Sequence, residues 1–298
     1  SFGSYSLFSL SIFFGLLSIE STNSNVDNPK GIMAYAIMSV YMAIGALVSF
    51  IVAKSSPVNY EKNIFYLISL LCFFALFINK SRTAQLAFIL TLIILLLIYS
   101  RKYLFNIKNM LIGLACTVII LFSSFYILNE TGKLKRYIAA YNETERIFKE
   151  DNYQGSLGVR IYFNIVGFKV FAEEPIFGSG PEDNISKFIE YQENDKNVIL
   201  KKVYRSYHSQ HIDYLTRYGI FGYILFIFSA LYLLRLLYNN KKLYYMYMSF
   251  LLVVFFSSLT NVMLIKKPFN YVYITVFVLF SVIAYYQNKK EKLDAKIS

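Results

Sequence analysis

Cysteine and histidine, which build disulfide frameworks and many metal centres, are scarce in this chain, with two of each among 298 residues. Cys72 and Cys116 both lie in apolar runs, where a thiol is typical of a small core residue, so no disulfide framework is expected. His208 and His211 lack a His-Glu-x-x-His pattern, and Asp213 is the one carboxylate near them in sequence. We therefore expect no metal ion and no other cofactor.

Charged side chains are nearly absent from the long apolar runs. The chain is 56% hydrophobic, and the runs are roughly 17 to 23 residues long, the length that spans a bilayer. Transporters coupled to protons or ions usually carry acids within their spans, so this scarcity argues against that class.

The first predicted span is short and residue 1 is Ser rather than Met, so we expect an incomplete N-terminus. The predicted spans are 5–19, 31–53, 63–79, 83–100, 110–128, 218–238, 243–265 and 269–286.

Positive charge is distributed unevenly between the loops. The net charge is +12, but residues 129–217 hold 13 basic and 13 acidic side chains and are neutral. The excess therefore lies in short loops near the spans, which argues against a nucleic-acid partner and for a lipid bilayer. The short loops of the two alternating sets hold twelve and five Lys/Arg, and the richer set is expected in the cytoplasm. The long segment 129–217 belongs to the poorer set. We therefore expect 129–217 outside the cytoplasm and the C-terminal tail inside.

Residues 129–217 have the periodicity of a folded helical domain. Two amphipathic helices are predicted, one over 134–148 and one from a Ser156 cap to about residue 172. Pro175 ends the second helix, and a turn rich in glycine follows it. Asp183 is expected to cap a short third helix.

A last helix is predicted to carry His208 and His211 on one face. It leads to Gly219 and Gly222, whose small size lets it pack closely against a neighbour. The whole pattern predicts an all-α protein, a polytopic membrane helix bundle of about eight spans with a helical extracytoplasmic cap. The expected domains are 1–128 with the N-terminal spans, 129–217 as the cap, and 218–298 with the C-terminal spans and tail.

Three groups on the predicted outer side are candidates for chemistry: Arg82, Arg160 and His208. The guanidinium fork matches the oxygens of a lipid pyrophosphate at the headgroup level. Histidine is a candidate proton-transfer group because its ordinary pKa lies near ambient pH. An interfacial arginine, a solvated arginine on a helix face and a surface histidine are the alternatives without a function. Glu173 and Glu174 are further candidate bases, or else a solvated helix end.

Four short segments of the chain match known sequence motifs, and they occur in the same order as those motifs. They are Ser81-Arg82-Thr83-Ala84, Ser156-Leu157-Gly158-Val159-Arg160, Glu174-Pro175-Ile176-Phe177-Gly178-Ser179-Gly180, and His208-Ser209 separated by nine residues from Gly219-x-x-Gly222. Together they resemble motifs of the bacterial O-antigen ligase and O-antigen polymerase family of membrane glycosyltransferases. The last segment is the most specific match and is ligase-like. Tyr223 departs from the pattern, which prefers an aliphatic residue there.

The resemblance implies the fold of C-type membrane glycosyltransferases, in the bacterial inner membrane with the large loop in the periplasm. It implies a metal-independent, inverting transfer of a glycan from undecaprenyl diphosphate to a sugar hydroxyl of lipid A–core. On the same basis Arg82 and Arg160 hold the pyrophosphate, and His208 is the general base or at least positions the acceptor. His211, one turn further along the predicted helix, is the other candidate base. His211 and Arg217 are expected to bind substrate. An O-antigen or capsular polysaccharide polymerase of the same family, a lipid-linked sugar flippase and a non-catalytic scaffold are the alternatives.

Overall fold

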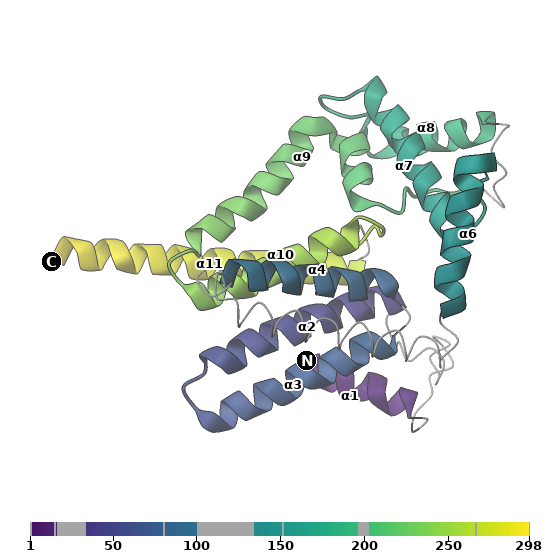
Figure 1. The fold of residues 1–298 in the computed structure, drawn as a ribbon. Helices are drawn as coiled ribbons and strands as arrows, with labels where there is room; N and C mark the ends of the chain where they lie inside the picture. The colour runs from purple at the N-terminus through teal and green to yellow at the C-terminus, as the bar shows by residue number, and fades with distance from the viewer. Residues whose placement is uncertain are drawn as a thin grey trace. The chain divides into compact units, whose positions relative to one another are not determined.

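The computed structural model describes residues 2–14, 16, 34–79, 81–99, 134–150, 152–195, 203–265 and 267–297. Over these residues the chain forms helices and turns without a strand, which confirms the predicted all-α class for the described part (Figure 1). The helices are α1 (Phe2–Phe13), α2 (Tyr35–Ser55), α3 (Asn59–Ile78), α4 (Arg82–Tyr99), α6 (Leu134–Glu150), α7 (Ser156–Glu173), α8 (Gly180–Asn194), α9 (Gln210–Leu236), α10 (Lys241–Ser258) and α11 (Lys267–Ile297).

Among the described residues, four helical segments are long and apolar enough to cross a membrane, by length and composition. The apolar helix Arg82–Ile98 is shorter. The predicted span 110–128 lies outside the described residues. The protein is therefore a multi-pass helical membrane protein, and the count of eight spans stays a prediction. The four segments are Ala36–Ser55, Asn59–Ile78, Gln210–Leu236 and Pro268–Lys290.

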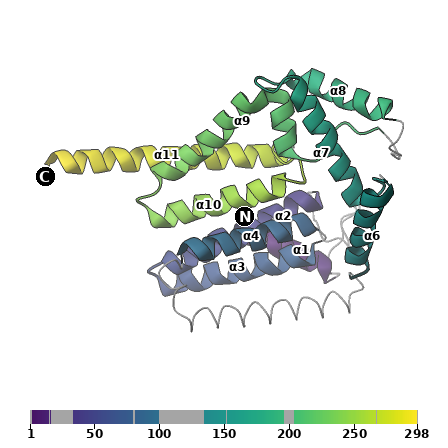
Figure 2. The same cartoon turned by 45° about the horizontal axis from the view of Figure 1, so that its top comes forward.

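The chain divides into two units: unit 1 comprises residues 1–95 and 224–298, and unit 2 comprises residues 96–223. Within unit 1, α2 packs against α1, α3 and α10, and most of its apolar length is buried (Figures 1 and 2). The apolar windows of α3 and α11 are mostly exposed, as expected for side chains that face lipid. Gly45 on α2 permits close packing, since a Cβ there would lie 2.8 Å from the Phe2 ring and 3.0 Å from Cys72 Sγ.

The turn between α3 and α4 is held by amide side chains. Asn79 Nδ2 donates to Ala75 O at 2.8 Å, and Gln85 Nε2 donates to Asn79 O at 3.0 Å. These bonds satisfy carbonyls that the end of a helix leaves without intrahelical donors. Thr83 Oγ1 lies 2.9 Å from Thr260 Oγ1, in the segment that follows α10. The first turn of α4, and with it Arg82, is therefore fixed within unit 1.

Unit 2 has its own core, built by α7, α8, the segment that precedes α9 and the start of α9 (Figure 2). Phe163 and Phe188 are fully buried, with their rings 5.2 Å apart in an edge-on arrangement. Lys187 of α8 pairs with Glu173 at 2.9 Å and with Glu174 at 2.7 Å, which ties α8 to the end of α7. The core residues are Tyr162, Phe163, Val166, Val170, Phe188, Tyr207 and Ile212.

The predicted helices over 134–148 and 156–172 are confirmed, but two of the expected caps are wrong. Gly155, with φ 125°, occupies the position that caps α7, and Glu143 Oε2 of α6 accepts the Leu157 N–H at 2.8 Å. A carboxylate from another helix thus binds the free N–H that we expected a Ser156 cap to serve. Helix α8 begins at Gly180, so Asp183 lies in its first turn rather than at its cap.

The α9 backbone is broken at Gly219, where φ is 63° and ψ is −172°. The N–H groups after the break donate to the turn behind α7: Ile220 N to Pro175 O at 2.8 Å, and Phe221 N to Ile176 O at 3.1 Å. In return, the carbonyl of Thr216 accepts the Ser179 N–H at 2.9 Å. Backbone groups that a continuous helix would pair internally are paired here by a turn. We call residues 175–179 and 216–221 the elbow.

Two glycines let the backbones of the elbow meet. Gly178 has φ 73°, and a Cβ there would lie 2.5 Å from Arg217 C; a Cβ at Gly219 would collide with Ile176 O. The close packing expected at Gly219 therefore exists, with the turn at residues 175–178 as its neighbour. A Cβ at Gly222 would meet Tyr218 of the same helix.

We predict that Gly178→Ala destabilises the protein more than Gly180→Ala. Both glycines have positive φ, 73° and 83°, so alanine costs about 1–2 kcal/mol at either position. A Cβ at Gly180 meets nothing within 4 Å, whereas one at Gly178 meets the backbone of α9. Thermal melting of the purified variants in detergent measures the difference, and equal melting temperatures would contradict the interlocked backbone.

Candidate functional site

The five residues that the sequence points to are divided between the two units. Arg82 is the first residue of α4 in unit 1, where it is exposed. Arg160, His208, His211 and Arg217 belong to unit 2 and are partly buried. The structure therefore brings four of the five into one folded unit, and the convergence of Arg82 with them stays a prediction.

His208 does not lie on a helix, so the expectation that it shares a helix face with His211 is wrong. Helix α9 begins at Gln210, after His208 has taken a positive φ of 53°. Ser209 occupies the position that caps α9: its Oγ accepts the Ile212 N–H at 3.5 Å and its carbonyl accepts the Asp213 N–H at 3.0 Å. The His208 N–H donates to Ser206 Oγ at 3.3 Å, within a turn of its own.

The His208 imidazole is held between aromatic rings of the unit 2 core. It stacks on the fully buried Phe163 ring, with centroids 5.8 Å apart and planes 10° from parallel, and Tyr204 lies edge-on at 6.3 Å. Tyr204 is fixed in turn by Gln192 of α8, whose amide donates to the Tyr204 carbonyl and accepts its N–H, both at 2.9 Å. The ring is therefore oriented on two sides before any substrate binds.

Arg160 lies on α7 one turn before Phe163. Side chains three residues apart on a helix are neighbours, about 5–6 Å apart at Cβ. The Phe163 ring in turn contacts the His208 imidazole. From this spacing we expect Arg160 to lie near Phe163, the ring on which His208 stacks, although 48 residues separate the arginine from the histidine in the sequence.

His211 contacts a tyrosine from the far side of the α9 break. Its Nδ1 lies 2.8 Å from the Tyr223 hydroxyl, and the two rings meet edge-on with centroids 5.9 Å apart. The bond joins the helix before Gly219 to the helix after it. Tyr223 is the residue that departs from the family's sequence pattern, and its hydroxyl makes a contact that an aliphatic side chain could not make.

Arg217 pairs with Asp213 one turn earlier on α9, with Nε 2.9 Å from Oδ2. Asp213 is only 2% exposed, so this carboxylate is an internal partner of the arginine rather than a surface charge. The i,i+4 spacing is a signal that the sequence offered for this pair.

A second set of polar contacts, which the sequence did not reveal, joins α8 to residues that precede and follow His208 in the sequence. Asn184 Nδ2 donates to Thr216 Oγ1 at 3.1 Å, and the Tyr207 hydroxyl donates to Asn184 O at 2.8 Å. Burial raises the pKa of Tyr207, so its phenol stays a proton donor at neutral pH. The residue next to His208 is thereby anchored to α8.

A family model described as O-antigen ligase matches residues 67–227, which is more than half of the chain. The matched range contains Arg82, Arg160, the elbow and His208. The chain belongs to the O-antigen ligase family. It is therefore a membrane glycosyltransferase of the O-antigen ligase or polymerase type. No curated protein matches the chain.

In this O-antigen ligase family member, Glu173 is a poor candidate for a base. A hydrogen bond from the Tyr191 hydroxyl, at 2.7 Å, and the ammonium of Lys187 lower the pKa of Glu173. Glu174 also pairs with Lys187. A lowered pKa means that the Glu173 carboxylate holds protons weakly at neutral pH. Among the described residues, no three His, Cys, Asp or Glu side chains are grouped as metal ligands would be.

We predict that Asp213→Ala lowers the free energy of unfolding of this O-antigen ligase family member by about 1–3 kcal/mol, because Arg217 loses a buried partner. Glu145→Ala is the matched control. Glu145 pairs with Lys149 at the same i,i+4 spacing and at 2.6 Å, but both side chains are largely exposed, so its loss should cost at most about 0.5 kcal/mol. Denaturant unfolding in detergent measures both values. Similar losses in the two variants would show that burial does not set the strength of the Asp213–Arg217 pair.

Proposed function

We propose that this protein is an O-antigen ligase-type glycosyltransferase, which moves a glycan from undecaprenyl diphosphate to a sugar hydroxyl of lipid A–core. The observation that supports the proposal is the stacking of His208 on Phe163, which follows Arg160 by three residues on α7, inside the segment that matches the family model. A base and a cation held at one place suit a reaction that removes a proton from one partner and releases a diphosphate from the other.

The proposed reaction is a single displacement. The neutral His208 imidazole accepts the proton of the acceptor hydroxyl as that oxygen bonds to the anomeric carbon of the donor. The bond between this carbon and the diphosphate oxygen breaks, and its electron pair leaves with undecaprenyl diphosphate. Attack from the face opposite the leaving group inverts the anomeric configuration.

Two arginines supply positive charge in this proposal. Arg160 and Arg82 bind the diphosphate and stabilise the negative charge that develops on it, so no metal ion is required. His211 and Arg217 lie on the first two turns of α9, directly after His208, and we assign them to substrate binding. The proposed site is at the outer face of the bacterial inner membrane, with residues 129–217 in the periplasm.

The proposed topology predicts that residues 186 and 290 lie on opposite sides of the membrane. Ser186 is exposed on α8 and Lys290 is exposed on α11, so a cysteine at either position can react from solvent. In a background without Cys72 and Cys116, a membrane-impermeant maleimide should label Ser186→Cys in intact spheroplasts and Lys290→Cys only after permeabilisation. Labelling of both variants from the same side would refute the topology.

We predict that His208→Ala abolishes transfer, since loss of a general base costs about 10²–10⁴-fold in rate. In a strain that lacks the gene, this variant should leave core-only lipid A and carrier-linked polymer, while the wild-type gene restores polymer on the core.

Arg160→Ala should weaken donor binding. The purified wild-type protein should form product in EDTA.

His211→Ala is the matched histidine control for this experiment. If His208→Ala is fully active and His211→Ala is inactive, His211 rather than His208 is the base. Core carrying a single repeat unit in the deletion strain would identify a polymerase. Activity that EDTA removes and a divalent cation restores would contradict catalysis by the two arginines.

A further inference from the structure

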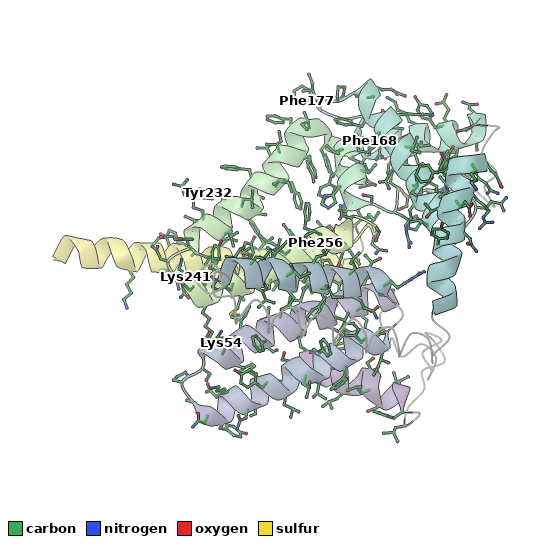
Figure 3. The ribbon with its side chains drawn as sticks, viewed as in Figure 1. Lys54, Phe168, Phe177, Tyr232, Lys241 and Phe256 are labelled. Carbon is green, nitrogen blue, oxygen red and sulfur yellow. The ribbon has the colours of Figure 1, made fainter. Side chains whose placement is uncertain are left out.

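The elbow carries large apolar side chains that the protein does not cover. Phe177 is 71% exposed and Ile176 is 59% exposed, and Figure 3 shows Phe177 at the outer edge of its turn. Across the interlocked backbone, the side chains of Ile220 and Phe221 are also exposed, and the Phe177 and Phe221 rings meet edge-on at 5.8 Å. Contiguous exposed apolar groups mark a surface that binds something.

We propose that the elbow is inserted into the lipid bilayer, at the boundary between headgroups and hydrocarbon. Ile220 and Phe221 begin the apolar part of α9, which continues to Leu236 within a helix able to span a membrane. Backbone hydrogen bonds of 2.8 and 3.1 Å hold Pro175 and Ile176 to these two residues. The turn and the start of the span therefore lie at one depth.

The length of α9 places this depth near the edge of the bilayer core. From Ile220 to Leu236 the helix has seventeen residues and rises about 25 Å at 1.5 Å per residue. The hydrocarbon core of a bilayer is about 30 Å thick. Arg235 lies at the other end of this stretch, and the Lys241 ammonium lies 3.3 Å from the centre of the Tyr238 ring, as is typical of an interface (Figure 3). The elbow then lies at the opposite interface.

Irregular backbone in lipid requires that its polar groups find partners within the protein, and four backbone groups of the 175–179 turn do so. The carbonyls of Pro175 and Ile176 accept bonds from α9, and the N–H groups of Gly178 and Ser179 donate to Glu174 O and Thr216 O. The sequence from 175 to 181 contains no charged residue. A bilayer can therefore cover this turn at low cost.

The charged residues next to the elbow are paired, which suits a position at the edge of the membrane. Glu173 and Glu174 pair with Lys187, and Asp213 pairs with Arg217. Ion pairing reduces the cost of placing charge near hydrocarbon. Tyr218, between Arg217 and the break, is an aromatic residue of the type that gathers at membrane interfaces.

The chain contains no tryptophan, so a single Phe177→Trp substitution gives a fluorescent reporter without background. In liposomes, we expect the wavelength of its emission maximum to shift to the blue. The emission intensity should fall when brominated lipids replace ordinary ones and should not be quenched by aqueous iodide. Phe148→Trp is the matched control, because Phe148 is 84% exposed on α6 beside the exposed Glu145–Lys149 pair. Its emission should fall with iodide and not with brominated lipid.

Ile176→Trp repeats the test in case Phe177→Trp does not fold. Quenching of both elbow reporters by iodide rather than by brominated lipid would overturn the proposal, as would equal behaviour of Phe177→Trp and Phe148→Trp. Protection from both quenchers would place a second protein chain on the elbow, which also overturns it. The fluorescence does not depend on glycosyl transfer, so this result and the proposed function can fail separately.

Discussion

The need to pair backbone polar groups at the Gly219 break is the constraint on which unit 2 depends. A helix that stops and restarts leaves N–H groups and carbonyls without their usual partners. The Pro175–Ser179 turn binds them, and this requires glycine at 178 and 219 because the two backbones approach too closely for a Cβ. The end of α7 and the start of α9 are thereby fixed to each other, although more than 30 residues separate them in sequence.

This constraint also explains what sequence reasoning could and could not predict. Helices α6 and α7 follow from local periodicity, and the apolar spans follow from composition. Both could therefore be predicted from the sequence. The Gly219-x-x-Gly222 spacing indicated close packing, but its partner is a turn about 40 residues earlier, which no local pattern specifies. The predicted Ser156 cap of α7 was wrong for the same reason. The carboxylate that accepts the Leu157 N–H belongs to Glu143 of another helix.

The candidate site shows the same division between residue type and placement. The sequence supplied the arginines and the histidines that could bind a pyrophosphate and move a proton. It wrongly placed His208 on a helix, because the capping role of Ser209 was not recognised. The stacking of His208 on Phe163 could not be predicted, since it depends on a core assembled from α7, α8 and the segment before α9. The i,i+4 spacing of Asp213 and Arg217 could have indicated their ion pair, but it could not have indicated that Asp213 is buried.

A chain of contacts links the elbow to His208, and this matters for a donor that remains in the membrane. Thr216 of the elbow accepts a hydrogen bond from Asn184, and the Asn184 carbonyl accepts one from Tyr207, the neighbour of His208. A lipid-linked diphosphate is held at headgroup height by its own lipid. The base that we propose must therefore keep a fixed height above the bilayer, since a misplacement of about 1 Å can cost a hundredfold in rate. An elbow inserted in lipid, joined to His208 through three buried polar side chains, would set that height.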